Sequence, residues 1–178
     1  MRFGRKPRGN EKLEALARKI EAVAKADQQR VRQAQEYARL RSRAAMELHQ
    51  TCAALTGELN ALLPEPLVEL SPPEYSADAF RDSGPNVFQI NVSGRIVHLE
   101  FHSTETLTST EKFATPYILE GSVRAFNQEL LELSVVPEQF LFCCVERERL
   151  NWLWFDPRSQ RSAPLDRTRL IQLLDRLM

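Results

Sequence analysis

The most constraining feature of this 178-residue sequence is the stretch from residue 11 to residue 63, which contains no proline and a single glycine, Gly57. Alanine, leucine, arginine, glutamine and glutamate dominate the stretch, and these residues are strong helix formers. The composition predicts one helix over residues 10–63, which at the usual helical rise is about 75–80 Å long. Because few globular helices reach that length, the sequence indicates a paired helix, as in a coiled coil.

Apolar residues in this helix recur at intervals of three and four, in two runs whose registers are offset near residues 24–27, as in a coiled-coil stutter. The first run consists of Leu13, Leu16, Ile20 and Val23. The second run extends from Val31 to Leu62 and is more apolar toward its end. We expect the helix to bind a second copy or a protein partner through this end, and the candidate interaction residues are Leu48, Leu55, Leu59 and Leu62.

Charge is distributed unevenly along the chain, although the formal net charge is zero. Residues 1–50 carry 13 Lys and Arg against 6 Asp and Glu, whereas residues 51–178 carry 11 against 18. This asymmetry suggests a basic arm with an anionic partner, or two parts of opposite charge that attract each other. We expect residues 1–9 to be a disordered basic tail. The candidate contacts to nucleic acid or another anionic partner are Arg5, Lys6, Arg8, Arg30, Arg32, Arg39, Arg41 and Arg43.

Acidic residues interrupt this basic series at positions 11, 14, 21, 27, 36 and 47. A dedicated nucleic-acid-binding helix would carry a denser positive charge, and the surfaces of coiled coils are commonly rich in lysine and arginine. We therefore favour a solvated helix surface over a nucleic-acid interface.

Five of the ten prolines fall in residues 64–85, which we interpret as a linker or a wrapped loop. From residue 86 onward the hydrophobic period becomes 2, as expected for strands. Ser93-Gly94 suits a two-residue hairpin turn, which would set Ile90 opposite Val97. The apolar residues of the two strands then share one face, which supports this register.

The remaining residues predict a strand over 117–126 with a bulge at Gly121, a second hairpin over 140–155 and an amphipathic helix near the end of the chain. "STETLTST" at residues 103–110 is interpreted as a loop or polar edge. The fold class is therefore α+β. A long N-terminal helix precedes an antiparallel sheet of about five strands with a C-terminal covering helix, over residues 86–178.

Residues 98–102 read "HLEFH", with two histidines around a carboxylate. On a strand, His98, Glu100 and His102 share one face, and the two histidines are ~13 Å apart. That distance is too long for one metal ion, whose protein ligands lie within ~2.0–2.3 Å. We favour a solvated strand face, with His98 opposite Gln89, over a metal site built from these three candidates.

The three cysteines are Cys52, Cys143 and Cys144. They form neither a Cys-x-x-Cys pair nor a disulfide framework, which suggests a reducing, cytoplasmic setting. Adjacent cysteines on a strand point to opposite faces, so one of Cys143 and Cys144 is expected to face the core. Buried, unreactive thiols are the favoured interpretation over a catalytic thiol.

The segment "NWLWFD" places Trp152 and Trp154 on one side of a strand, with apolar residues on the other. A strand that is apolar on both faces is normally sandwiched between layers. We favour this arrangement, with the long helix or its dimer mate as the second cover. If only one face is covered, the two tryptophans form an aromatic binding surface, and they are candidate interaction residues for that reason.

No phosphate-binding, dinucleotide-binding or nucleophile-elbow motif occurs in the sequence, and no window approaches the ~18 apolar residues of a membrane span. We expect no cofactor and no transmembrane segment. The leading hypothesis is a non-enzymatic protein-interaction or scaffolding module that self-associates or binds a partner through its long helix. The alternatives are a nucleic-acid-associated factor that uses its basic arm, and a small metal-binding or enzymatic domain.

Overall fold

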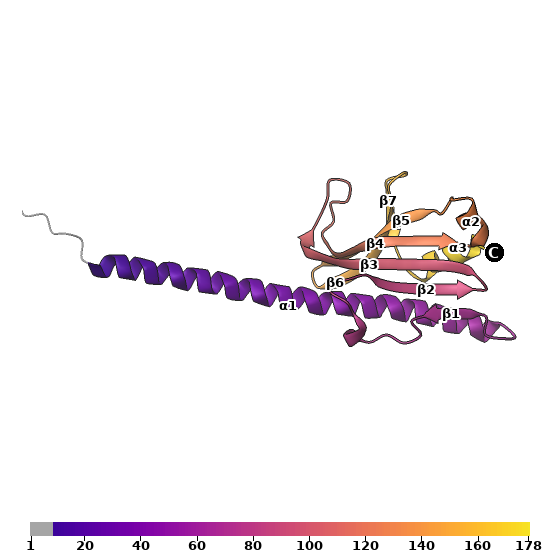
Figure 1. The fold of residues 1–178 in the computed structure, drawn as a ribbon, viewed down its shortest axis with the longest axis horizontal. Coiled ribbons are helices and arrows are strands. Elements are labelled where there is room, and N and C mark those ends of the chain that lie inside the picture. The colour runs from indigo at the N-terminus through magenta and orange to yellow at the C-terminus, as the bar shows by residue number, and fades with distance from the viewer. Residues whose placement is uncertain (1–8) are drawn as a thin grey trace, which may run out of the picture. The chain divides into compact units, whose positions relative to one another are not determined.

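A computed structural model describes residues 9–178 and has the predicted α+β architecture. The chain divides into two compact units, residues 1–37 and residues 38–178. Helix α1 (Gly9–Leu62) supplies the described part of the first unit and the first segment of the second (Figure 1). Arg5, Lys6, Arg8 and almost all of the expected basic tail lie outside the described residues.

Within the first unit, every described side chain from residue 10 to residue 36 is exposed. The apolar run predicted from the sequence is exposed as well, with Leu13, Leu16, Ile20 and Val23 between 53% and 64% accessible. An ion pair of 2.8 Å joins Lys25 to Glu21 one turn earlier, which adds modest local support to the helix.

The second unit contains an antiparallel sheet whose strands lie side by side in chain order (Figure 1). Within residues 9–178 the sheet has seven strands, so the expected number of about five is wrong. The strands are β1 (Val68–Ser71), β2 (Asn86–Val92), β3 (Arg95–Thr108), β4 (Tyr117–Phe126), β5 (Glu138–Glu146), β6 (Arg149–Asp156) and β7 (Arg161–Pro164).

The two additional strands, β1 and β7, form the edges of the sheet and have four residues each. Prolines adjoin β1 and end β7, and each strand is too short for a hydrophobic period of 2 to stand out. Of the stretch 103–110 that was interpreted as a loop or polar edge, residues 103–108 continue β3, with an irregular register between Ser103 and Thr108.

Both predicted hairpins are present, and the register of the first is confirmed, with Ile90 opposite Val97 and Gln89 opposite His98. At its turn, Ser93 and Gly94 have φ angles of 50° and 86°. The second hairpin turns through two residues that also have positive φ. Positive φ at both central positions is typical of the type I′ turns that match the twist of paired strands.

Gly121 is not a bulge, because the pairing of β3 with β4 is continuous through it, with Gly121 opposite Phe101. A Cβ atom at this position would lie 1.9 Å from the carbonyl oxygen of Glu100 and 2.6 Å from the Cα of Phe101. Glycine is therefore required for the close approach of the two strands rather than for an extra residue.

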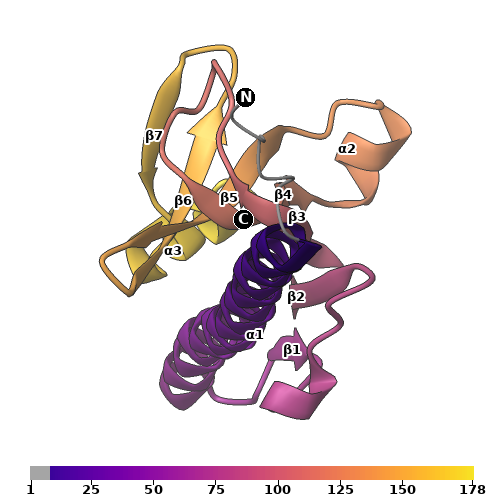
Figure 2. The same ribbon diagram turned by 90° about the vertical axis from the view of Figure 1, so that its left-hand side faces the viewer.

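The second segment of α1, from residue 38, and the C-terminal helix α3 (Arg167–Asp175) pack on the same face of the sheet (Figure 2). We call this the covered face. Short helices η1 (Ala77–Ala79) and α2 (Gln128–Glu132) lie in connecting segments. The core of the covered face includes Leu48, Leu55, Phe88, Ile90, Leu99, Phe101, Leu141, Cys143 and Leu170.

Candidate functional site

The four candidate interaction residues of α1, which are Leu48, Leu55, Leu59 and Leu62, are divided between the core and the surface. Leu48 and Leu55 are each 1% accessible, because the chain's own sheet covers them. Leu59 is half-buried, and Leu62 is 84% accessible in the last turn of the helix. Of these four candidates, Leu59 and Leu62 at the end of α1 are therefore the ones accessible to another protein.

Arg41 is the side chain that fastens α1 to the sheet by hydrogen bonds. It is 6% accessible, and its Nε donates to the carbonyl oxygen of Ile118 at 3.2 Å. One terminal nitrogen donates to the carbonyl oxygen of Thr104, and the other lies 3.3 Å from a carboxylate oxygen of Asp82. Because these donors are engaged within the chain, Arg41 is not presented to an external phosphate.

The other basic candidates of α1 remain at the surface. Arg30, Arg32, Arg39 and Arg43 are exposed. Arg30 lies 3.7 Å from Asp27, and Arg43 donates to the carbonyl oxygen of Glu148 at 2.9 Å. Among the described residues, the structure does not gather these arginines into a single patch with the buried Arg41.

Trp152 and Trp154 both point to the covered face. Trp152 is 8% accessible, and its indole N–H donates to the carbonyl oxygen of Ala44 in α1 at 2.9 Å. The guanidinium carbon of Arg169 in α3 lies 4.2 Å above the ring of Trp154, which is a cation–π contact. The tryptophans thus fasten the helices to the sheet and do not form an exposed aromatic patch.

The opposite face of the sheet, which we call the open face, carries His98, Glu100 and His102 of "HLEFH". Nδ1 of His98 lies 2.8 Å from the amide nitrogen of Gln89, and Nε2 lies 3.3 Å from the carboxylate of Glu100. His102 instead lies 3.3 Å from the carboxylate of Glu120 on the neighbouring strand. The two histidines therefore pair with different carboxylates.

No group of three or more histidines, cysteines, aspartates or glutamates within residues 9–178 is placed to hold a metal ion. All three cysteines are buried and free. Burial raises the pKa of the Cys52 and Cys144 thiols to about 12, and it raises the pKa of Cys143 as well. Since thiolates are the reactive form, these cysteines are poor nucleophiles near neutral pH.

An aromatic cavity on the open face was not predicted from the sequence. Its volume is about 490 Å³, within the range of small-molecule sites. Phe113 from the β3–β4 connection stacks on Phe142 with a centroid distance of 4.2 Å. Phe140 is 46% accessible, which is unusual for a phenylalanine beside a buried cluster. The aromatic residues that line the cavity are Phe113, Tyr117, Phe140, Phe142 and Phe155.

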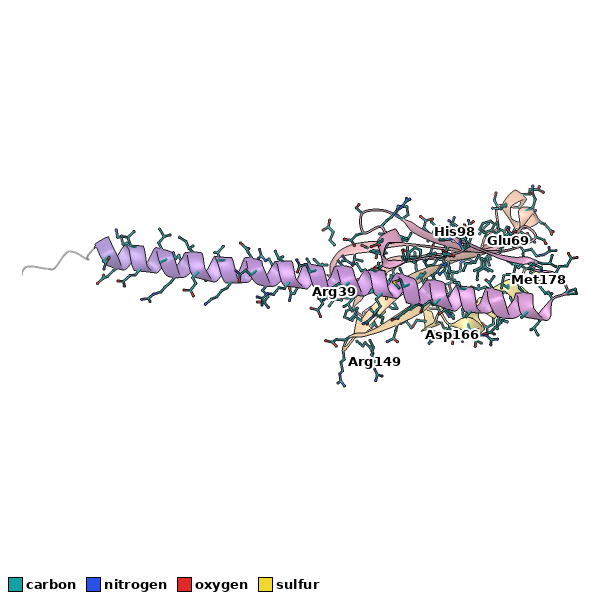
Figure 3. The ribbon with its side chains drawn as sticks, turned by 90° about the horizontal axis from the view of Figure 1, so that it is seen from below. Arg39, Glu69, His98, Arg149, Asp166 and Met178 are labelled. Carbon is teal, nitrogen blue, oxygen red and sulfur yellow. The ribbon has the colours of Figure 1, made fainter. Side chains whose placement is uncertain are left out.

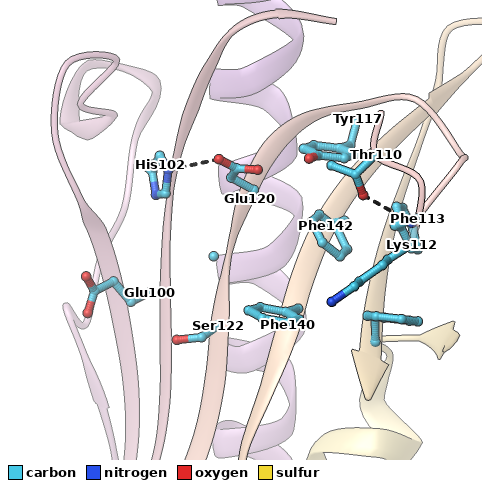
Figure 4. Close-up of a pocket in the computed structure, with 12 residues that line it drawn as sticks. Glu100, His102, Thr110, Lys112, Phe113, Tyr117, Glu120, Ser122, Phe140 and Phe142 are labelled. Atoms are coloured by element: carbon cyan, nitrogen blue, oxygen red, sulfur yellow. Dashed lines mark hydrogen bonds and ion pairs between the residues drawn. The ribbon is translucent and has the colours of Figure 1, made fainter. Parts of the chain in front are cut away.

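Polar side chains line two sides of this cavity (Figure 4). Glu100, His102 and Glu120 lie along β3 and β4, and Lys112 extends over the aromatic rings from the β3–β4 connection. Glu120 lies 3.3 Å from His102, and Glu100 lies 3.6 Å from Arg124, so each of these two carboxylates has a basic neighbour. Lys112 forms no ion pair with any residue in the described part of the chain.

A second, almost wholly apolar groove lies where the end of α1 meets α3, and we call it the terminal groove. Its volume is about 310 Å³. Figure 3 shows Met178 beside the last turns of α1, at this end of the second unit. The accessible fractions of Leu62, Ile171 and Met178 are 84%, 39% and 65%. The groove is lined by Leu59, Leu62, Leu63, Val68, Val92, Ile171, Leu174, Asp175 and Met178.

The signals for the two cavities are weak in the sequence. Phe113 stands alone in a polar connection, and the terminal groove combines four separated segments of the chain.

No family model, curated protein or solved structure matches this chain. None of the helices within residues 9–178 is long and apolar enough to cross a membrane.

Proposed function

We propose that this protein is a non-enzymatic interaction module that self-associates through residues 10–37 of α1. The observation that carries the proposal is the exposed row of Leu13, Leu16, Ile20 and Val23, which we call the stripe. Each of these side chains is more than half accessible. A contiguous exposed apolar row on a helix is typical of a surface that another protein covers.

The difference in burial between the two segments of α1 supports this proposal. Leu48 and Leu55 are used inside the second unit, where they are covered by the sheet. Within the first unit, no other described residue covers the stripe, and its side chains recur at the spacing of one helix face. Residues 10–37 are therefore available for association without unfolding any part of the sheet.

The test is the mass of the full-length protein by light scattering on a sizing column, with variants that change the stripe alone. The chain mass is 20.5 kDa, and we expect a wild-type mass of twice this value or more. Leu16→Glu places a charge in the stripe and should give a monomer. Ala22→Glu is the matched control, because Ala22 is exposed on the same helix but off the stripe.

A monomeric wild-type protein at concentrations up to 100 µM would contradict the proposal. Persistence of the associated mass in Leu16→Glu would also contradict it, since the stripe would then not be the contact. A mass that is the same at 50 and 500 mM salt is expected for an apolar contact, whereas binding to an anionic partner weakens steeply with salt.

The aromatic cavity favours a second candidate function, the binding of a small planar apolar anion. The exposed ring of Phe140 would be covered by an apolar body, and Lys112 would pair with the negative group. Titration with 3-phenylpropionate, followed by amide NMR shifts, tests this candidate. Saturable shifts at Lys112 and Phe113 are expected, and they should be lost in Lys112→Gln but not in the control Lys25→Gln. Shifts of the same size in both variants would exclude it.

A further inference from the structure

Among the described residues, the stripe and the terminal groove are exposed apolar surfaces, and one is convex whereas the other is concave. The stripe is a convex row on a helix, with side chains 53–64% accessible. The terminal groove is concave, and its lining is almost wholly apolar. Leu62 in this groove is 84% accessible, which is more than any of the four side chains of the stripe.

The stripe is better suited to a groove than to a second stripe. Coiled coils sustain their apolar repeat over three or four heptads, but continuing the repeat of the stripe places Asp27 and Arg30 at the next two core positions. In a parallel pair, the flanking Lys12 and Lys19 would face Ala17 and Ala24 of the second helix, so no interhelical ion pair would form.

The spacing of the stripe matches the anchors of a helix that binds in a groove. Leu13, Leu16, Ile20 and Val23 occupy positions i, i+3, i+7 and i+10, and Ala17 beside them occupies position i+4. This is the pattern by which amphipathic helices insert one face into an apolar groove.

The opposite net charges of residues 1–37 and residues 38–178 indicate which groove would receive the stripe. Residues 1–37 carry ten Lys and Arg against five Asp and Glu, a balance of +5, and residues 38–178 carry 14 against 19, a balance of −5. Among the described residues, Asp175 is the one charged side chain that lines the terminal groove. The stripe is flanked by Lys12 and Lys19, so opposite charges would meet at the rim.

We propose that the stripe of one copy binds in the terminal groove of a second copy. This inference rests on the proposed self-association and names the surface that receives the helix. Two reciprocal contacts of this kind would cover the stripe and the groove of both copies, whereas stripe-to-stripe pairing leaves both grooves exposed to water.

A complementation experiment with two full-length variants tests this contact. Leu16→Glu disables the stripe and leaves the groove intact. Leu62→Lys disables the groove and leaves the stripe intact, and it sits at a highly exposed position, so the fold should tolerate it. Ala61→Lys is the matched control, because Ala61 is exposed next to Leu62 but does not line the groove.

We expect each variant alone to have the monomer mass of 20.5 kDa by light scattering, and the equimolar mixture to give twice that mass. The mixture restores one intact stripe and one intact groove. The protein concentration at which half of the chains are associated should therefore be at least tenfold lower for the mixture than for either variant alone. Ala61→Lys should behave as the wild type does.

Two results would overturn the inference, and they differ in what they say of the proposed function. If Leu62→Lys associates like the wild type while Leu16→Glu does not, the stripe binds something other than this groove, and self-association through the stripe survives. If the wild type is a monomer, both the inference and the proposed self-association fail.

Discussion

Replacing Arg41 tests whether this side chain fastens the long helix to the sheet or serves an external partner. Its guanidinium donates to the carbonyl oxygens of Ile118 and Thr104, and it pairs with Asp82. A hydrogen bond from a charged donor contributes about 1.5–3 kcal/mol. The Asp82 side chain is 56% accessible, so that pair adds at most about 1 kcal/mol.

Arg41→Leu should therefore lower the free energy of unfolding by about 3–4 kcal/mol, after allowing for the apolar contacts of the new side chain. The hydroxyl of Thr104 lies 3.1 Å from the carbonyl oxygen of Ile118 and 2.7 Å from that of Thr106, and its single proton can turn to Ile118 once Arg41 is gone, which limits the loss at that acceptor. Arg41→Lys should lose about half as much, because a lysine offers one compact donor group in place of a planar fork.

The assay is urea denaturation followed by circular dichroism, with the slope of the transition checked for two-state behaviour. Arg39→Leu is the matched control, because Arg39 is exposed two residues earlier, and we expect a change within about 0.5 kcal/mol. If Arg41→Leu is as stable as Arg39→Leu, the fastening role of Arg41 is refuted.

Two further predictions concern the sheet and the thiols. Gly121→Ala should cost about 3 kcal/mol or more, because its Cβ would lie 1.9 Å from a backbone oxygen, whereas Gly57→Ala in open space should stabilise the helix by up to about 1 kcal/mol; thermal denaturation compares them. The thiols should resist a thiol reagent at pH 8 until urea is added. Unfolded thiols ionise near pH 9.0, but folded Cys52 and Cys144 do so near pH 12. The free energy of unfolding should therefore fall between these values by about 1.4 kcal/mol per pH unit for each thiol, and Cys52→Ala should reduce this slope. An unchanged slope in that variant would contradict the assignment.

The hairpins were predictable because local chemistry determines them. The alternating residues of β2 and β3, with Ser93-Gly94 between them, specify both the turn and the register. The edge strands β1 and β7 were missed because their pairing depends on neighbours already in place and not on their own four residues.

The sequence could not show which surfaces remain open. We expected Trp152 to lie beneath the long helix or its dimer mate, with an exposed patch as the alternative. The chain's own α1 covers it, through a contact that joins residues far apart in the chain. The apolar residues of β5 and β6 lie on both faces, so their pattern does not reveal which face the helices cover. The same ambiguity concealed the aromatic cavity.

The order of elements also affects how the chain folds during synthesis. The carbonyl group of Ala44 in α1 accepts its hydrogen bond from Trp152, which lies 108 residues later in the sequence. At ~5–20 residues per second, a ribosome takes roughly 5–20 s to add that many residues. Leu48 and Leu55 are buried in the finished fold, and they remain uncovered until the strands that pack on them have been synthesised. The nascent helix is thus an exposed apolar surface for seconds, which gives a chaperone time to bind it.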